Sequence, residues 1–342
     1  MSLSRTGGLA SLLVLLACGS TSVVGVDPPT DGSAPPPSGT PTGTPTTPPP
    51  PPPPPGDAGT DGPRPAQGLR FVAVGDTGKG TPGQQSVADA IAAKCQASGC
   101  DFVQLLGDNI YESGVTSADD PLLQSRFEIP YAKVNAPFFV VLGNHDYGAN
   151  GLGTEFGKGK NEVDYTAKST KWKLPAAYYH HVKGDAEFFA LDTNLILFNR
   201  ADNQKSDFPG WISASKSIWK IAFGHHPYLS NGPHGNAGNY DGIPLIGATV
   251  KSFFDDTICG KTDVYISGHD HSTQWLEPTC AGTELIVAGA GAEGTSLTSR
   301  NKSRFQTANR SFFYIVLEGK KLTAEVIDEA GAVRFTRTLT KP

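Results

Sequence analysis

Five short apolar runs in the sequence end alike, with a glycine followed at once by an aspartate, an asparagine or a histidine. The polar residues at these endings are Asp76, Asp108, Asn144, His225 and His269. Glycine lets the backbone turn sharply and come close to a bound group. One such ending would mean little, but five favour a single shared site.

Three more side chains with chemical potential stand beside these endings, namely Tyr111, His145 and His271. Carboxylate, phenol, amide and imidazole donors suit iron, zinc or manganese and are ill suited to copper(I). About seven ligands exceed the needs of one tetrahedral ion, whereas two ions about 3.5 to 4 Å apart, bridged by a carboxylate, would use them all. The residue types therefore predict a two-metal centre.

The runs that carry these residues have the pattern of a mixed α/β domain beginning near Leu69. We expect strands at 69–76, 102–108, 137–146, 219–227 and 263–271, and three more between 312 and 339. The spacing of apolar residues in 84–95 predicts a helix that packs on a sheet. In open α/β sheets, sites form outside the carboxyl ends of strands, where loops can carry polar groups that a buried strand cannot.

Taken together, GDTG, GDNIY, GNHD, GHH and GHDH resemble, in this order, the five motif blocks of the calcineurin-like metallophosphoesterases. Many of these relatives have Asp-x-His in the first block. This chain has Gly78 in place of that histidine and offers Tyr111 instead, which points to the purple acid phosphatase (tartrate-resistant acid phosphatase-like) branch. The resemblance implies an α/β fold, a four-layer α/β/β/α sandwich of two mixed sheets flanked by helices, with the metals at one edge.

The resemblance also implies a role for each ligand. The first metal would be held by Asp76, Tyr111 and His271. The second would be held by Asn144, His225 and His269, and Asp108 would bridge the two. A phenol with an ordinary pKa near ~10 ionises at mild pH only beside a strong Lewis acid, so we expect Fe(III) at the Tyr111 site. Fe(II), Zn(II) or Mn(II) is expected at the second; the alternative for Tyr111 is packing against its own loop.

Three other residues are candidate catalytic groups. His145 resembles the family's proton donor to the leaving alkoxide. Asp146 could orient a histidine by accepting its second N–H, or could cap the next loop. His234 lies nine residues after His225, as the substrate-loop histidine of purple acid phosphatases does, and would contact phosphate or face solvent. His226 stands where the animal enzymes carry tyrosine, which alters the pocket wall.

The function implied is hydrolysis of phosphate monoesters by a hydroxide held on the two metals. A phosphodiesterase or nucleotide pyrophosphatase on the same centre is one alternative, and a noncatalytic metal-binding surface module is another. A dinucleotide fold is disfavoured although 78–83 matches its glycine spacing, because Pro82 interrupts the segment and no acidic residue ends the next strand. His180 and His181 match no block and are expected in a strand with one exposed face.

The N-terminal part of the chain has a different composition. Residues 1–17 read as a lipoprotein-type signal peptide, and Cys18 as a lipidated residue, with ordinary secretion as the alternative. Residues 18–67 are rich in Pro, Gly and Thr and predict a disordered linker before a catalytic domain at 68–342. We therefore expect export, with the protein anchored to the bacterial envelope or secreted.

The remaining cysteines and the net charge limit the kinds of partner that the protein can have. The spacing favours disulfides between Cys95 and Cys100 and between Cys259 and Cys280, with zinc binding as the alternative. A net charge of -5 gives no basic field for nucleic acid. We expect a monomer whose partner is a small phosphorylated substrate and whose contact with a membrane is made only through Cys18.

Overall fold

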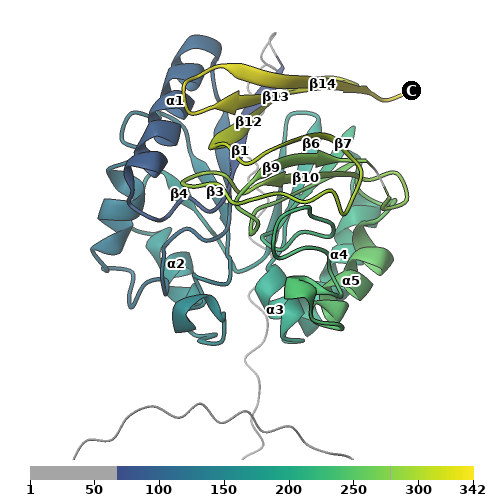
Figure 1. Ribbon diagram of the computed structural model, residues 1–342, viewed down its shortest axis with the longest axis horizontal. Coiled ribbons are helices and arrows are strands. Elements are labelled where there is room, and N and C mark those ends of the chain that lie inside the picture. Colours follow the sequence, from purple (N-terminus) through teal and green to yellow (C-terminus); the bar gives the residue numbers. More distant parts are fainter. Residues whose placement is uncertain (1–67, 278) are drawn as a thin grey trace, which may run out of the picture. The chain divides into compact units, whose positions relative to one another are not determined.

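The computed structural model describes residues 68–277 and 279–342. The predicted signal peptide, Cys18 and the linker at 18–67 lie outside the described residues. Within the described part, two mixed sheets pack against each other and helices cover their outer faces (Figure 1). This arrangement confirms the predicted four-layer sandwich.

The first sheet combines parallel strands from the start of the domain with antiparallel strands from its end. In the described residues its strand order is β14-β13-β12-β1-β2-β3-β4. The strands are β1 (Leu69–Val74), β2 (Phe102–Leu106), β3 (Phe138–Val141), β4 (Trp172–Lys173), β12 (Ser311–Glu318), β13 (Lys321–Asp328) and β14 (Val333–Thr340). β1 to β4 are parallel, so the carboxyl ends of β1, β2 and β3 meet at one edge. On the other side of β1, β12 pairs antiparallel with it, and the sheet continues through β13 to β14.

The second sheet also combines parallel and antiparallel strands. Its order within the described residues is β11-β9-β10-β8-β7-β6-β5. The strands are β5 (Tyr179–Lys183), β6 (Ala186–Ala190), β7 (Trp219–Phe223), β8 (Val264–Ser267), β9 (Thr273–Leu276), β10 (Glu284–Ala288) and β11 (Ser303–Thr307). β6, β7, β8 and β10 are parallel, which sets the ends of β7 and β8 side by side.

Helices cover the outer faces, with α1 and α2 beside the first sheet and α3, α4 and α5 beside the second (Figure 1). The α-helices are α1 (Pro82–Ser98), α2 (Gly159–Tyr165), α3 (Thr193–Leu197), α4 (Asp202–Ala214) and α5 (Ala248–Phe253). The shorter 3-10 and π segments are η1 (Gln124–Glu128), η2 (Ala149–Gly151), η3 (Tyr240–Gly242) and η4 (Phe254–Ile258). α1 begins two residues before the predicted helix, because the Thr81 side chain accepts a hydrogen bond from Gln84 N and a proline fills the first turn.

Aromatic side chains fill the space between the sheets. Phe71 of β1 stacks on Phe102 of β2 at 4.9 Å between ring centroids, and Phe188 of β6 meets Phe71 edge-on at 5.5 Å. All three are fully buried, and burying each such ring contributes about 1.5–3 kcal/mol. The two sheets are thus held at a fixed separation below the edge where the polar endings emerge.

The predicted strands and the helix at 84–95 are present, and the three C-terminal strands are confirmed as β12, β13 and β14. Both predicted disulfides, Cys95–Cys100 and Cys259–Cys280, are formed, so these cysteines do not bind zinc. His180 and His181 lie in β5 as expected. Among the described residues, no helix has the length and apolar character needed to cross a bilayer.

Candidate metal centre

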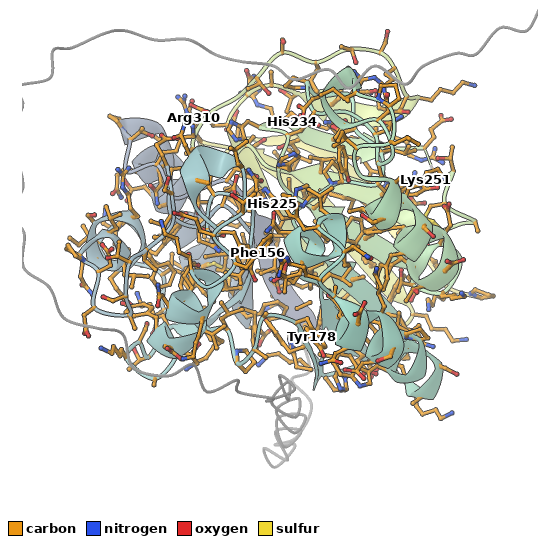
Figure 2. All side chains as sticks on the ribbon, turned by 90° about the horizontal axis from the view of Figure 1, so that it is seen from below. Phe156, Tyr178, His225, His234, Lys251 and Arg310 are labelled. Carbon is orange, nitrogen blue, oxygen red and sulfur yellow. A yellow bond between two sulfur atoms is a disulfide. The ribbon has the colours of Figure 1, made fainter. Side chains whose placement is uncertain are left out.

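The five glycine-polar endings converge at the carboxyl ends of their strands. Asp76 follows β1, Asp108 follows β2 and Asn144 follows β3, while His225 and His269 follow β7 and β8. Figure 2 looks onto this face of the domain, with His225 near its centre. The sheets approach closely here because the glycines lack side chains. A Cβ at position 268 would lie 2.5 Å from Asp76 Oδ2.

The first group of donors surrounds the hydroxyl of Tyr111. Its Oη lies 3.2 Å from Asp76 Oδ1, 3.1 Å from Asp108 Oδ2 and 3.0 Å from His271 Nε2. Tyr111, Asp76 and Asp108 are buried. Burial, together with the Asp108 and Asp76 carboxylates, raises the pKa of Tyr111 well above its ordinary value. A phenolate can therefore exist here only if a cation lies among these oxygens.

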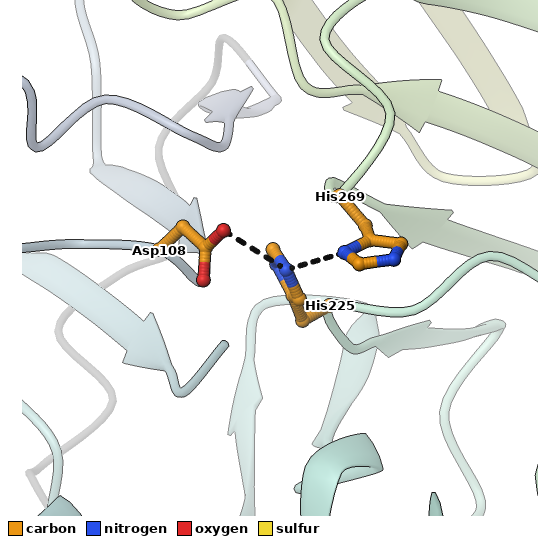
Figure 3. A group of neighbouring side chains, drawn as sticks. All are labelled: Asp108, His225 and His269. Atoms are coloured by element: carbon orange, nitrogen blue, oxygen red, sulfur yellow. Dashed lines mark hydrogen bonds and ion pairs between the residues drawn. The ribbon is translucent and has the colours of Figure 1, made fainter. Parts of the chain in front are cut away.

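The second group of donors surrounds Nε2 of His225. This nitrogen lies 2.9 Å from Asn144 Oδ1, 3.1 Å from His269 Nδ1 and 3.3 Å from Asp108 Oδ2. Figure 3 shows Asp108 and His269 on either side of His225. Burial works to lower the pKa of His225, but the Asp108 carboxylate outweighs it and raises the pKa to about 9.

Asp108 joins the two groups. Its Oδ2 contacts both the Tyr111 hydroxyl and His225 Nε2, as expected for a carboxylate that bridges two ions. Burial works to raise the pKa of Asp108, but His225 and His145 outweigh it and hold this pKa well below its usual range. The predicted bridge is therefore an ionised carboxylate at the centre of the cluster.

The chemistry of the donors fits two metal ions. One hydroxyl in the first group faces three acceptors, and one ring nitrogen in the second faces three. Carboxylate, phenol, amide and imidazole groups that face one another at such short distances form the kind of donor set that binds two cations. All seven predicted ligands are thus brought together, and the group formed by Asp108, His225 and His269 could by itself hold an ion.

Neighbouring groups orient the ligands. His225 Nδ1 donates to Leu106 O at 2.9 Å, which leaves Nε2 free for a metal. Asn144 Nδ2 donates to Gly151 O at 2.7 Å, which turns the amide oxygen inward. The backbone N–H of His145 donates to Asp108 Oδ1 at 2.9 Å, which leaves Oδ2 for the bridging position.

Three of the proposed ligands have a backbone conformation that favours glycine. The φ angles are 59° at Asp76, 51° at Asp108 and 70° at His269. Such conformations in residues other than glycine cost about 1–3 kcal/mol each and concentrate at functional sites. The backbone is therefore locally strained at these three proposed ligands.

Asp146 holds the loops together and contacts no described histidine ring. Its Oδ1 accepts hydrogen bonds from Asn109 N at 2.8 Å and Ile110 N at 3.0 Å, and its Oδ2 accepts one from Gly143 N at 2.7 Å. The Asn109 side chain also donates to Oδ2 at 2.9 Å. These partners lie in the loop after β2 and in the turn just before Asp146, so Asp146 ties two loops together and neither orients a described histidine nor caps the loop that follows it.

The two remaining candidate catalytic residues lie beside the ligands. The His145 ring lies 4.3 Å from the Tyr111 ring, and its Nδ1 donates to Glu112 O at 2.6 Å. The His234 ring lies 4.1 Å from the His269 ring, with Nδ1 2.7 Å from Asp241 Oδ1. Both histidines are partly exposed and can meet a substrate.

His226 is buried in the pocket wall. Its ring centroid lies 4.6 Å from that of His269, and Thr193 Oγ1 lies 2.9 Å from its Nδ1. Burial lowers the pKa of His226 well below its ordinary value, and His225 adds to this effect, so the ring is neutral. This agrees with its expected role in the wall rather than in the chemistry.

The replacement of the first-block histidine by Gly78 has a direct steric reason. A Cβ at position 78 would lie 1.8 Å from Asn109 O. Gly78 O also accepts the backbone hydrogen bond of Tyr111 N at 3.0 Å. The turn that brings Tyr111 into the site therefore occupies the space that a side chain at position 78 would need.

Sequence reasoning missed Lys79 and Glu293, which lie beside the first group of donors. Glu293 Oε1 is 2.8 Å from His271 Nδ1 and 2.6 Å from Lys79 Nζ. β10 is followed by the sequence Gly-Ala-Gly-Ala-Glu, which ends at Glu293. The search for a polar residue directly after a glycine did not find Glu293, because an alanine precedes it. A wider window after each strand end would have found it.

A family model described as calcineurin-like phosphoesterase matches residues 69–273. Among curated proteins, the chain is 27% identical over 317 residues to tartrate-resistant acid phosphatase type 5 of Rattus norvegicus, covering 80% of this chain and 91% of that protein. It is 30% identical over 264 residues to the same enzyme of Mus musculus, covering 68% and 75%. It is 25% identical over 303 residues to purple acid phosphatase 4 of Arabidopsis thaliana, covering 79% and 83%.

Two solved structures share the fold. One is GAP50, the anchor in the inner membrane complex of Plasmodium, with a TM-score of 0.66 and 22% identity, covering 80% of this chain and 89% of that chain. The other is purple acid phosphatase PPD1 from yellow lupin (Lupinus luteus) seeds, with a TM-score of 0.60 and 18% identity, covering 80% and 53%. At these identities the likeness bears on the fold alone.

Proposed function

The chain belongs to the calcineurin-like phosphoesterase family, and on that premise we propose that it hydrolyses phosphate monoesters at a two-metal centre, as purple acid phosphatases do. The broader class, a hydrolase of phosphoric esters, follows from the family and from its acid phosphatase relatives. The single observation that carries the finer proposal is the position of Asp108 Oδ2. It lies 3.1 Å from the Tyr111 hydroxyl and 3.3 Å from His225 Nε2, between two complete groups of donors.

Bound at this centre, two metals would supply a nucleophile at mild pH and neutralise the charge that develops on the phosphoryl oxygens. The protein's own contribution is to hold the groups around them. Asp76, Tyr111 and His271 would hold one ion, Asn144, His225 and His269 the other, and Asp108 both.

Two histidines would handle the substrate itself. With Nδ1–H donating to Glu112 O, Nε2 of His145 carries a proton only in the imidazolium form, and in that form Nε2–H can give its proton to the leaving oxygen and leave a neutral ring. His234 is held by Asp241 and lies against His269, where its ring can donate to a phosphate oxygen.

The reaction class is tested by comparing p-nitrophenyl phosphate with bis(p-nitrophenyl) phosphate across pH. We expect the monoester to have the larger kcat/KM at every pH where activity is seen. A clear preference for the diester would contradict the proposal and favour a phosphodiesterase.

The role of His145 is tested by His145→Ala. General acid assistance contributes roughly 10² to 10⁴ in rate, so turnover of an alkyl phosphate should fall by about this factor. Because His145 provides no ligand atom to either group, metal content should stay at the wild-type level. Loss of metal in this variant would place His145 in the ligand set and contradict its role as proton donor.

The two groups of donors differ in negative charge, and this difference affects which metal ion each group would bind. The first includes two carboxylates and a phenol, whereas the second adds only an amide and two imidazoles to the shared Asp108. We propose Fe(III) in the first and Fe(II), Zn(II) or Mn(II) in the second. Tyrosinate bound to Fe(III) would colour a concentrated sample purple or pink. A colourless, zinc-loaded and active protein would refute the iron assignment and leave the phosphatase assignment intact.

We also propose that the protein is exported and acts as a monomer on a small phosphorylated substrate. The disulfides Cys95–Cys100 and Cys259–Cys280 support an oxidising compartment. Lipid attachment at Cys18 is part of the proposal, and a mass shift of the mature N-terminus that is lost in Cys18→Ser would test it.

A further inference from the structure

Lys79 and Glu293 form a charged pair at the edge of the first group of donors, and neither belongs to any of the five motif blocks. Glu293 Oε1 lies 2.6 Å from Lys79 Nζ and 2.8 Å from His271 Nδ1. The other ring nitrogen of His271, Nε2, lies 3.0 Å from the Tyr111 hydroxyl and 3.5 Å from Asp76 Oδ1. His271 therefore sits between Glu293 on its outer side and the donors on its inner side.

Lys79 also contacts Tyr111 directly. Its Nζ lies 4.3 Å from the centroid of the Tyr111 ring, within the range of a cation–π interaction. The side chain of Lys79 is only 17% exposed, so its charge is poorly screened by water. One ammonium group thus contacts the ring of one proposed ligand and a carboxylate that lies beside another.

Backbone contacts fix Glu293 in this position. Within its loop, Gly291 N donates to Gly75 O at 3.1 Å and Thr295 N donates to His271 O at 2.7 Å. The segment is therefore tied on one side to the end of β1 and on the other to the residue that Glu293 contacts.

We propose that Glu293 and Lys79 are positioning residues of the first metal site, an inference that rests on the proposed two-metal centre. Glu293 fixes the tautomer and orientation of His271, so that Nε2 faces the metal. Lys79 holds Glu293 in place and sets a positive charge over the ring of Tyr111. A carboxylate behind a ligating histidine raises its basicity, and loss of such a partner costs about 10–100-fold in metal affinity.

The chain offers a matched control pair away from the site. Lys94 Nζ lies 2.9 Å from Glu325 Oε2 and 4.4 Å from the centroid of the Tyr314 ring, which repeats the Lys–Glu–Tyr geometry of the site. Glu325→Gln and Lys94→Met therefore remove equivalent interactions without touching the donors.

The test compares Glu293→Gln with Glu325→Gln in the purified holoenzyme, by metal content after dialysis against graded chelator. We expect Glu293→Gln to lose one metal equivalent at about 10–100-fold lower chelator concentration than wild type. The Glu325→Gln protein should match wild type. Equal metal retention in Glu293→Gln and wild type would overturn the inference.

Lys79→Met adds a spectroscopic readout in protein loaded with iron. Removing a positive charge from the tyrosinate ring raises the energy of its filled orbitals, so the charge-transfer band should move to longer wavelength. Lys79→Arg should restore its position, and Lys94→Met should not move it. An unmoved band in Lys79→Met would overturn the positioning role of Lys79. If the KM of this variant also rose while its metal content stayed unchanged, Lys79 would be a substrate contact instead.

Metal analysis separates this inference from the proposed function. Wild-type protein that binds no metal would overturn both. Wild-type protein with two metals and the expected monoesterase activity, but with Glu293→Gln unchanged, would overturn only the inference.

Discussion

His225 and His181 both have buried ring nitrogens, and the first histidine lies at the carboxyl edge of the sheets whereas the ring of the second lies between the two sheets. His225 is fully buried, and each of its ring nitrogens faces a polar partner. Both ring nitrogens of His181 are buried without a hydrogen-bond partner among the described residues. Its ring instead stacks on Phe139 at 4.0 Å between centroids.

The two environments move the pKa in opposite directions. Burial lowers the pKa of His181 to about 3, and the nearby positive charges of Lys183 and His180 add to this effect. Burial has the same tendency at His225, but Asp108 reverses it and raises that pKa to about 9. Burial alone therefore does not indicate a functional histidine. The partner at hydrogen-bond distance decides whether the ring can take part in a charged site.

The largest effect in this comparison is expected from Asp108→Asn, which removes the carboxylate that distinguishes the two environments. Both groups of donors lose their shared anion, so we expect loss of both metals and a fall in kcat/KM of more than about 10³-fold. Metal analysis and monoester hydrolysis measure the two effects.

Asp263→Asn is a suitable control, because Asp263 stands at the opposite end of β8 and accepts a hydrogen bond from Lys220 N at 2.7 Å. This variant should keep its metals and its activity. If Asp108→Asn kept two metals per chain, the bridging role of Asp108 would be wrong.

A smaller effect, on folding, is expected from Gly78→Ala. The new Cβ would lie 1.8 Å from Asn109 O, in the turn that carries Asp108 into the site. Overpacking of this kind typically costs up to about 3 kcal/mol, and here the neighbour that must move is backbone. Urea unfolding of the metal-free protein measures the loss without a contribution from bound ions.

Gly210→Ala serves as the comparison for Gly78→Ala. Gly210 lies within α4, and a Cβ there would have no described atom within 4 Å. Alanine should stabilise this helix by roughly 0.5–1 kcal/mol. A tolerated Gly78→Ala with unchanged stability would show that the edge of the sheets is less closely packed than the core.

The convergence of the proposed ligands could be predicted because the information lies within each strand ending. A glycine and a polar residue at five strand ends, in a parallel arrangement, are enough to bring Asp76, Asp108 and His225 together. The role of Asp146 could not be predicted, because its partners belong to the loop after β2 and no pattern in the sequence pairs the two loops.

The contacts of Lys79 and of His181 could not be predicted from the sequence for a similar reason. Glu293, which pairs with Lys79, lies far away in the chain and is placed by backbone hydrogen bonds of its own loop. The alternation of β5 places His181 on one face of its strand, but Phe139, which covers that face, belongs to the other sheet. Local patterns thus predicted the strands and the convergence of the proposed ligands, whereas contacts between loops and between sheets had to be observed.

The smallest expected effect comes from His181→Phe, and it depends on pH. The folded-state pKa of His181, about 3, lies below its unfolded value of 6.5. Above pH 6.5 the ring is neutral in both states and contributes full stability. As pH falls from about 6.5 toward 3, the unfolded chain binds a proton that the folded chain does not, so stability is lost.

Phenylalanine has no proton to bind and can stack on Phe139 in the same place, so the variant should escape this loss. At pH 5 the gap from 6.5 is about 1.5 pKa units, which corresponds to roughly 2 kcal/mol. The difference in free energy of unfolding between His181→Phe and wild type, measured by urea titration, should therefore be larger at pH 5 than at pH 8 by this amount. The pH 8 measurement absorbs any change in packing, because His181 is neutral there in both states. The same difference at both pH values would mean that His181 is protonated as easily in the folded protein as in the unfolded chain. The contrast with His225 would then rest on something other than the absence of a polar partner.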